Sequence, residues 1–310
     1  MSVEVEALAV EATGVSVRFR RVVALDDVDL RVRPGSVTAL LGQNGAGKTT
    51  LINTLVGYRK PDAGTVRVVG LDPAAEPLQV RRRVGYVGDQ PALYDWMRID
   101  EIGSFTAAFY DDGFFDAYRR LIAGYGLAAD AKVGELSRGQ RAKVALALAV
   151  APDPPLLILD EPTGGLDPRV RREFLESMID RAAAGRAVLL SSHHIDEVER
   201  VADEVVIIDR GRVKLAGALE ALKSSVTRLT IRLDDPLVSL PAVGEDATPL
   251  SEDTRGRVRR VVGIGLEDYA DAVARTAGVD DVTHDRPSLE DVFLAVTSEA
   301  DAPAAVGAGS

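Results

Sequence analysis

The sequence predicts an α/β fold with a largely parallel sheet, and two observations lead to this prediction. Short apolar runs alternate with helical patterns over the first two thirds of the 310 residues, an order typical of strands joined by helices. Several of these runs are apolar at nearly every position, as expected of strands buried on both faces. The runs occupy residues 36–42, 65–70, 155–160, 186–192 and 204–209.

Two regions depart from this alternation. From residue 97 to residue 132 the pattern is helical, and we expect a helical lobe over about 97–150. After about residue 225 a second, small α/β unit is predicted. Residues 227–233 and 257–265 have the pattern of strands, residues 266–278 that of a helix, and Ser288 with Asp291 opens a last helix. We therefore expect domains over 1–225 and 226–298, followed by a flexible tail over 299–310.

Composition excludes several classes of protein. Hydrophobic residues make up 46% and charged residues 27%, the balance of a soluble globular protein. The longest apolar run, residues 144–151, is far shorter than the roughly 18 residues that cross a bilayer. The first residues carry glutamates where a secretory signal carries basic residues, so a cytoplasmic protein is expected. The absence of cysteine excludes disulfides and iron–sulfur clusters, and a net charge of −11 argues against nucleic acid as a partner.

A glycine-rich loop, "GQNGAGKTT" at residues 42–50, lies between a predicted strand and a predicted helix. Glycines let backbone N–H groups surround phosphate oxygens, and the helix N-terminus adds partial positive charge. Lys48 is expected to reach the β- and γ-phosphates, and the Thr49 hydroxyl to bind Mg²⁺. The alternative is an ordinary glycine-rich turn with an exposed lysine.

Two adjacent acids, Asp160 and Glu161, end the apolar run at 155–160. Neighbouring side chains of an extended segment diverge, so one acid is able to serve a metal ion while the other faces an attacking water. The alternative is a strand end with two solvated acids.

A third motif, residues 134–151, begins a helix at Ser137. Serine is a good N-cap residue, and the N–H groups that follow it, those of Arg138, Gly139 and Gln140, are expected to form an anion site. The alternative is a well-capped helix without a ligand.

Taken together and in this order, the motifs resemble those of the nucleotide-binding subunit of ATP-binding-cassette (ABC) transporters over roughly residues 5–220. The matching segments are "GQNGAGKTT" as Walker A, "GDQ" as the Q-loop, "LSRGQ" as the signature, "LLILDE" as Walker B, "GGLD" as the D-loop and "SSHH" as the switch. The resemblance implies a P-loop NTPase cassette with a helical lobe, ATP and Mg²⁺ as ligands, and ATP hydrolysis.

The resemblance also assigns a role to each matching residue. It makes Glu161 the general base, with His193 and Gln90 as the other catalytic residues, and it gives the metal ion to Thr49, Gln90 and Asp160. The residues that it assigns to nucleotide binding are Phe19, Gly42, Asn44, Gly45, Gly47, Lys48, Thr49, Thr50, Ser137, Gly139, Gln140 and Asp167. Phe19 would stack on adenine, although a phenylalanine beside a strand is often a core residue.

The second histidine of the switch, His194, is expected to point away from His193, because adjacent extended residues face opposite sides. The two do not form a zinc site, since the third histidine, His284, is distant in the sequence. The chain departs from the family pattern at Arg138, where the signature has a second glycine, and at Gly165, where the D-loop has a serine. Ser137 and Gly139, the positions that would touch the γ-phosphate, are kept. We therefore expect the two departures to change the rate of ATP hydrolysis rather than the reaction itself.

In this family the signature of one subunit completes the phosphate site of another. The chain has one copy of each motif, so the resemblance implies a head-to-tail dimer with itself or a homologous subunit. It also implies separate transmembrane permease subunits, and a place at the cytoplasmic face of the membrane. The ending "PSLEDVFLAVT" resembles that of drug and antibiotic exporter ATPases, which favours export. A non-hydrolysing ATP-dependent dimer switch is the alternative.

Overall fold

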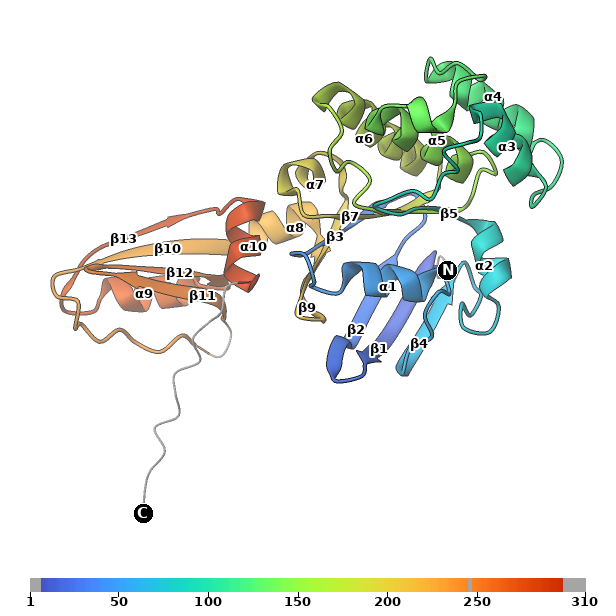
Figure 1. Cartoon of the computed structure of the whole chain (residues 1–310). Helices are drawn as coiled ribbons and strands as arrows, with labels where there is room; N and C mark the ends of the chain where they lie inside the picture. Colours follow the sequence, from blue (N-terminus) through green and yellow to red (C-terminus); the bar gives the residue numbers. More distant parts are fainter. Residues whose placement is uncertain (1–6, 245–246, 298–310) are drawn as a thin grey trace, which may run out of the picture. The chain divides into compact units, whose positions relative to one another are not determined.

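The computed structural model describes residues 7–244 and 247–297, so the tail predicted over 299–310 lies outside the described residues. The chain forms two compact units, Met1–Ala216 and Gly217–Ser310, each drawn in Figure 1. In the described part of both units, no helix combines the length and the apolar character needed to span a bilayer.

The centre of the first unit is a six-stranded sheet with the order β5-β6-β7-β3-β8-β9. Its first five strands all pair in parallel, which confirms the parallel sheet. The runs at 36–42, 155–160, 186–192 and 204–209 form β3, β6, β7 and β8. The bounds are β3 Val37–Leu41, β5 Val84–Val87, β6 Leu156–Asp160, β7 Ala187–Ser192, β8 Glu204–Asp209 and β9 Arg212–Ala218. All residues of β3, β6 and β7 are buried.

A second sheet, which is antiparallel, was only partly predicted. It has the order β2-β1-β4, with bounds β1 Val10–Phe19, β2 Val22–Val32 and β4 Ala63–Val68. The apolar run at 65–70 belongs here rather than to the parallel sheet. Helix α1 (Lys48–Leu55) lies between the two sheets (Figure 1) and buries Leu51, Ile52 and Leu55 in their common core.

Helices cover the other face of the six-stranded sheet (Figure 1). Helix α6 (Pro168–Ala183) and part of α5 (Arg138–Val150) bury apolar side chains against it. Helices α3 (Ile99–Ala107) and α4 (Phe114–Gly124) pack with the opposite face of α5 around a separate core. At the centre of that core Tyr118 is fully buried and donates a hydrogen bond to the Ile99 carbonyl at 2.8 Å. Two shorter helices, α2 (Pro77–Arg83) and α7 (Ile195–Val201), follow β4 and β7.

The second unit contains an antiparallel sheet with the order β11-β12-β10-β13. Alternate residues of β10, namely Leu229, Ile231 and Leu233, form its core together with α9. Strand β11 lies in the polar stretch where no strand was predicted, whereas the capping pair Ser288 and Asp291 is confirmed. The bounds are α8 Leu219–Ser225, β10 Val226–Leu233, β11 Thr248–Arg255, β12 Val258–Ile264, α9 Glu267–Ala274, β13 Val279–Asp285 and α10 Leu289–Thr297.

A buried carboxylate joins three segments of the first unit. Glu197 of α7 is only 1% exposed. It accepts a hydrogen bond from the Thr163 hydroxyl at 2.6 Å, in the loop after β6, and pairs with Arg171 Nε of α6 at 3.2 Å. Because a buried charge is costly without partners, this network holds the loop after β6 against the two helices.

We predict that Glu197→Ala lowers the free energy of unfolding by about 1–3 kcal/mol, because it leaves the buried Thr163 hydroxyl without its acceptor and Arg171 without its partner. The matched control is Glu176→Ala. It removes an exposed ion pair with Arg172, the neighbour of Arg171 on α6, and should lower the free energy of unfolding by less than about 1 kcal/mol. Urea unfolding followed by circular dichroism measures both. Equal losses in the two variants would contradict the prediction.

Candidate functional site

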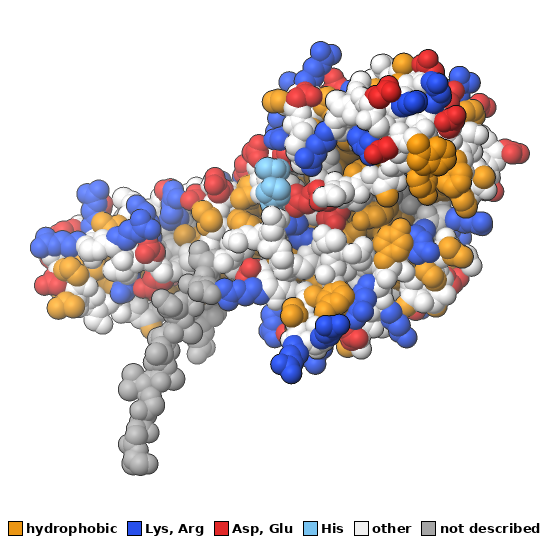
Figure 2. Space-filling view, in the orientation of Figure 1, with side chains coloured by type: hydrophobic (Ala, Val, Ile, Leu, Met, Phe, Trp, Pro, Cys, Tyr) orange, Lys and Arg blue, Asp and Glu red, His pale blue; other side chains and the backbone are white. Residues whose placement is uncertain are grey.

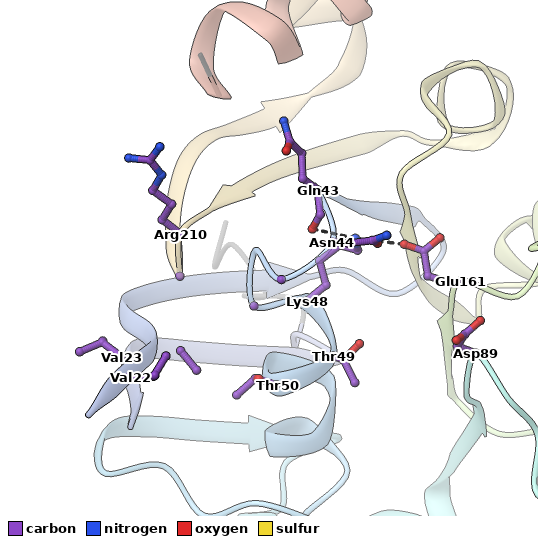
Figure 3. A pocket seen from close by; sticks show the side chains of 14 residues that line it. Val22, Val23, Gln43, Asn44, Lys48, Thr49, Thr50, Asp89, Glu161 and Arg210 are labelled. Atoms are coloured by element: carbon purple, nitrogen blue, oxygen red, sulfur yellow. Dashed lines mark hydrogen bonds and ion pairs between the residues drawn. The ribbon is translucent and has the colours of Figure 1, made fainter. Parts of the chain in front are cut away.

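A cavity of about 350 Å³ lies beside the carboxyl ends of the parallel strands (Figure 3). The loop after β3 and the start of α1 line its middle, Asp89 after β5 and Glu161 after β6 lie on one side of them, and Arg210 after β8 lies on the other (Figure 3). The start of β2 closes it. The lining residues are Val22, Val23, Ala24, Gln43, Asn44, Gly45, Gly47, Lys48, Thr49, Thr50, Asp89, Glu161, Arg210 and Gly211.

Two glycines of the loop are required by close packing. A Cβ atom on Gly42 would lie 2.5 Å from the Ile208 carbonyl oxygen, and one on Gly47 would lie 2.8 Å from the Ala24 carbonyl oxygen. Gly47 also has a φ of 113°, which only glycine adopts without strain. Gly45 has a φ of 83° but open space around it. The loop can therefore approach β2 and β8 closely only without side chains at residues 42 and 47.

Lys48 is buried, with 5% of its surface exposed, so the alternative of an exposed lysine is wrong. Its ammonium group donates hydrogen bonds to the carbonyl oxygens of Gly42 at 2.6 Å and Gln43 at 3.4 Å. It also pairs with Glu161 Oε1 at 3.0 Å, the contact marked in Figure 3. The loop thus fixes a positive charge at the wall of the cavity.

The two acids at the end of β6 have different partners, as the diverging side chains predict. Asp160 is 1% exposed and accepts a hydrogen bond from the Ser191 hydroxyl at 2.8 Å. Glu161 lines the cavity, and its Oε2 lies 2.7 Å from His193 Nδ1. The Glu161 backbone has a φ of 50°, an uncommon conformation for a residue with a side chain. A strained backbone thus directs this carboxylate between Lys48 and His193.

The expectation for His194 is wrong. The rings of His193 and His194 do not diverge, because their centroids lie 4.0 Å apart. The alternation of side chains holds only within a strand, and β7 ends at Ser192. His194 is already the residue that precedes α7.

Asp89, which sequence reasoning did not select, lines the cavity, whereas its neighbour Gln90 does not. Gln90 lines two other hollows, which both also include Gly88 and Pro91 of the segment that follows β5. Next to this segment, burial and then the charge of Asp160 raise the pKa of Tyr86 to about 12. The one signal for Asp89 in the sequence is its position, two residues after the end of β5, since every parallel strand of the sheet delivers residues to this edge.

Phe19 neither belongs to the core nor lines the cavity. Its side chain is 46% exposed, and the Arg59 guanidinium lies over its ring at 4.7 Å. The cavity is instead lined at this end by Val22 and Val23, two further residues that sequence reasoning missed.

The four predicted residues at the starts of α5 and α6 lie outside the cavity of their own chain. Ser137 is the N-cap of α5, and its hydroxyl accepts from the Gln140 N–H at 3.2 Å while Gln140 Oε1 accepts from the Ser137 N–H at 2.9 Å. Asp167 caps α6 in the same way through the N–H groups of Arg169 and Val170. Neither these residues nor Gly139 line the cavity that contains Lys48. Within the described ranges no group of three acidic or histidine residues could hold a metal ion on its own.

Comparisons with known proteins agree with this geometry. Residues 25–164 match the family model described as "ABC transporter". The chain is 35% identical to the daunorubicin resistance ATP-binding protein DrrA2 of Streptomyces coeruleorubidus, over 94% of this chain and 96% of that protein. It is 34% identical to the Nod factor export ATP-binding protein I of Cupriavidus metallidurans, over 89% and 92%. A solved ATP-binding subunit of an ABC transporter is similar with a TM-score of 0.65 and 31% identity, over 70% of this chain and 92% of that one.

We predict that Gly47→Ala weakens nucleotide binding at least about tenfold, since a Cβ atom there collides with backbone at 2.8 Å and a shift of one ångström in the loop misplaces the phosphate contacts. Gly185→Ala is the matched control, because it also places a side chain at a positive φ but without a collision and away from the residues that line the cavity, and should bind within about threefold of wild type. Calorimetric titration with ATP measures both. If both variants bind alike, close packing of residue 47 is not what shapes the loop.

Proposed function

The chain belongs to the ATP-binding subunits of ABC transporters, and on that premise we propose that it powers export through separate membrane subunits by ATP-driven closure of a dimer. Members of this family bind and hydrolyse ATP. The observation that carries the proposal is the cavity, in which a glycine-rich loop, a buried lysine and a strained glutamate meet.

The proposed chemistry follows from three side chains. Lys48 and the loop N–H groups neutralise the phosphates. A γ-phosphate competes with Glu161 for the Lys48 ammonium, because both are anionic oxygen groups in reach of one cation. Glu161 is then left to orient the attacking water and accept its proton, while His193, at 2.7 Å from its other oxygen, holds the carboxylate and contacts the γ-phosphate.

Mg²⁺ fits the oxygen donors present here, because this ion is usually held by one or two carboxylates, a hydroxyl and the phosphates themselves. Thr49 lines the cavity, and Asp160 lies directly before Glu161. We assign the third position to Asp89 rather than to Gln90, since Asp89 lines the cavity. The ion would neutralise phosphate charge there.

The nucleoside end of the cavity lies beside the β1–β2 hairpin. Val22 and Val23 line it and are 65% and 43% exposed, so they offer apolar surface to a base. Phe19 stays a candidate for stacking on adenine, because its ring is exposed and lies on the same hairpin. The Arg59 guanidinium lies over this ring.

A second subunit supplies what this cavity lacks. Ser137, Gly139, Gln140 and Asp167 cap or begin helices outside the cavity of their own chain. We assign them to the nucleotide of a second copy or a homologous subunit, packed head to tail. Each dimer would then enclose two nucleotides between its faces.

An exposed aromatic cluster is the proposed surface for the membrane subunit. The cluster consists of four side chains that are 46–71% exposed, namely Tyr94, Trp96, Phe105 and Phe109. The ring centroids of neighbouring members lie 5.6–6.0 Å apart. Hydrophobic side chains gather on this side of the first unit in Figure 2. A hollow of about 500 Å³ that includes Leu93 and Tyr110 adjoins them. Large exposed apolar patches mark interaction sites, and this one would place the chain at the cytoplasmic face of the membrane.

Export rather than import is supported by the names of the relatives. They include daunorubicin resistance and Nod factor export proteins that are matched over about nine tenths of their length. One name states export, and the other states resistance to a drug. We therefore place the chain in a drug-type exporter.

We predict that Glu161→Gln keeps ATP binding but lowers hydrolysis by at least about a hundredfold, the contribution of a positioned base. Since ATP then persists, the variant should accumulate a closed dimer with ATP and Mg²⁺ and not with ADP. Light scattering after size exclusion measures the dimer, and phosphate release from the complex with its membrane subunits measures hydrolysis.

The control for this variant is Lys48→Ala, which should bind ATP poorly and stay monomeric. Wild-type hydrolysis by Glu161→Gln would show that Glu161 is not the base. Dimer closure in a wild-type chain that never hydrolyses ATP would favour the alternative of a non-hydrolysing switch.

We predict that Asp89→Asn weakens divalent-metal binding in the presence of ATP about 10- to 100-fold, as loss of a ligand or its neighbour does in metal sites. Gln90→Ala is the matched control, and its metal affinity should equal that of the parent protein. Electron paramagnetic resonance of Mn²⁺ titrated into the Glu161→Gln protein with ATP gives both affinities. If the Gln90 variant loses the metal instead, Asp89 is not the residue that faces it.

A further inference from the structure

The two residues that depart from the family pattern lie against each other. Arg138 is the first residue of α5, and Gly165 lies in the loop between Glu161 and α6. A Cβ atom on Gly165 would lie 2.5 Å from Arg138 Nη1, 2.7 Å from Cζ and 3.0 Å from Nε. The flat guanidinium group therefore lies directly against the backbone of Gly165, in the space that a side chain at residue 165 would occupy.

The loop beneath the guanidinium is a short turn that carries Glu161. The Gly164 N–H donates to the Glu161 carbonyl at 3.3 Å, and the Leu166 N–H donates to the Thr163 carbonyl at 3.1 Å. A Cβ atom on Gly164 would lie 3.4 Å from Arg138 Nη2, so the guanidinium covers both glycines. Glu161 has a φ of 50°, an uncommon conformation for a residue with a side chain, whereas Gly165 has a φ of 69°, which glycine adopts without strain. The strain at Glu161 persists only when its surroundings hold it.

The guanidinium contacts the turn at the surface of the unit, since Arg138 and Gly165 are both exposed. Within residues 7–244 and 247–297 Arg138 forms no ion pair, unlike Arg141 of the same helix, which pairs with Asp95 at 2.6 Å. Its contact surface is the backbone of the turn, and an arginine side chain is planar enough to cover such a surface where a lysine is not.

We propose that Arg138 is a positioning residue that couples the start of α5 to Glu161 of the same chain. The inference rests on the proposed function, in which the start of α5 meets the nucleotide of the second subunit and Glu161 acts on the chain's own nucleotide. A movement of α5 on contact with the partner's nucleotide would shift Arg138 and, with it, the Gly164–Gly165 turn. Glu161 lies three residues before this turn and would move with it. Arg138 would thus connect the two nucleotide sites of a dimer.

The first test measures the turn itself in the isolated full-length chain by amide hydrogen exchange. Arg138→Gln should speed exchange at the Gly164 and Leu166 N–H groups on the order of tenfold, because it removes the guanidinium group that covers the turn and so makes local opening easier. Gly165→Ala displaces the flexible guanidinium and should do the same. Gly185→Ala is the matched control, because it has a similar φ of 83° with open space around it, and should leave the turn unchanged.

The second test is a double-mutant cycle on hydrolysis by the complete complex. Arg138→Gln and Gly165→Ala should each lower kcat about tenfold with the KM for ATP within about twofold. The double variant should lie within about twofold of the lower single variant, because both changes break one contact. Arg138→Lys should not restore kcat, since it keeps the charge but not the flat contact surface.

Three results would overturn the inference: unchanged exchange in Arg138→Gln, losses in kcat that multiply in the double variant, or full rescue by lysine, which would show that Arg138 acts by charge alone. A wild-type complex that fails to hydrolyse ATP would refute the proposed function instead. In that case the exchange measurement alone decides whether Arg138 holds the turn.

Discussion

The parallel pairing of β3 between β7 and β8 is the constraint on which the site depends. In a parallel sheet every strand ends at the same edge, so the glycine-rich loop after β3, Glu161 after β6, His193 after β7 and Arg210 after β8 all reach that edge from distant parts of the sequence. The pairing of the strands thus brings the site residues together, and contacts between side chains set their final positions. The Lys48–Glu161 pair at 3.0 Å joins two of these ends directly.

The sequence predicts the elements that are strongly apolar. Strands β3, β6, β7 and β8 were found because each contains a run of apolar residues that is buried on both faces. The glycine-rich loop and the N-cap at Ser137 were found because their chemistry depends on residue type at fixed spacing. The packing that makes Gly42 and Gly47 necessary was not predictable, since the atoms that they avoid belong to Ile208 and Ala24.

What the sequence did not predict depends on long-range pairing or on local geometry at strand ends. Strand β11 contains charged and polar residues and is almost fully solvent-facing, so it has no apolar pattern to detect. The alternation rule was applied to His194, which lies two residues beyond the end of β7. Asp89 and Gln90 are adjacent, and only the exit angle of the chain from β5 decides which of them reaches the cavity.

The separate core around Tyr118 has a mechanical consequence. Helices α3, α4 and one face of α5 bury their apolar side chains among themselves, while Ala145, Leu146 and Ala149, on the other face of α5, belong to the core of the sheet. A rotation of the helical lobe that carried α5 with it would keep the lobe's own core together and would break mainly the contacts of α5 with the core of the sheet. Helix α5 is shared by the two cores, and Arg138 is its first residue.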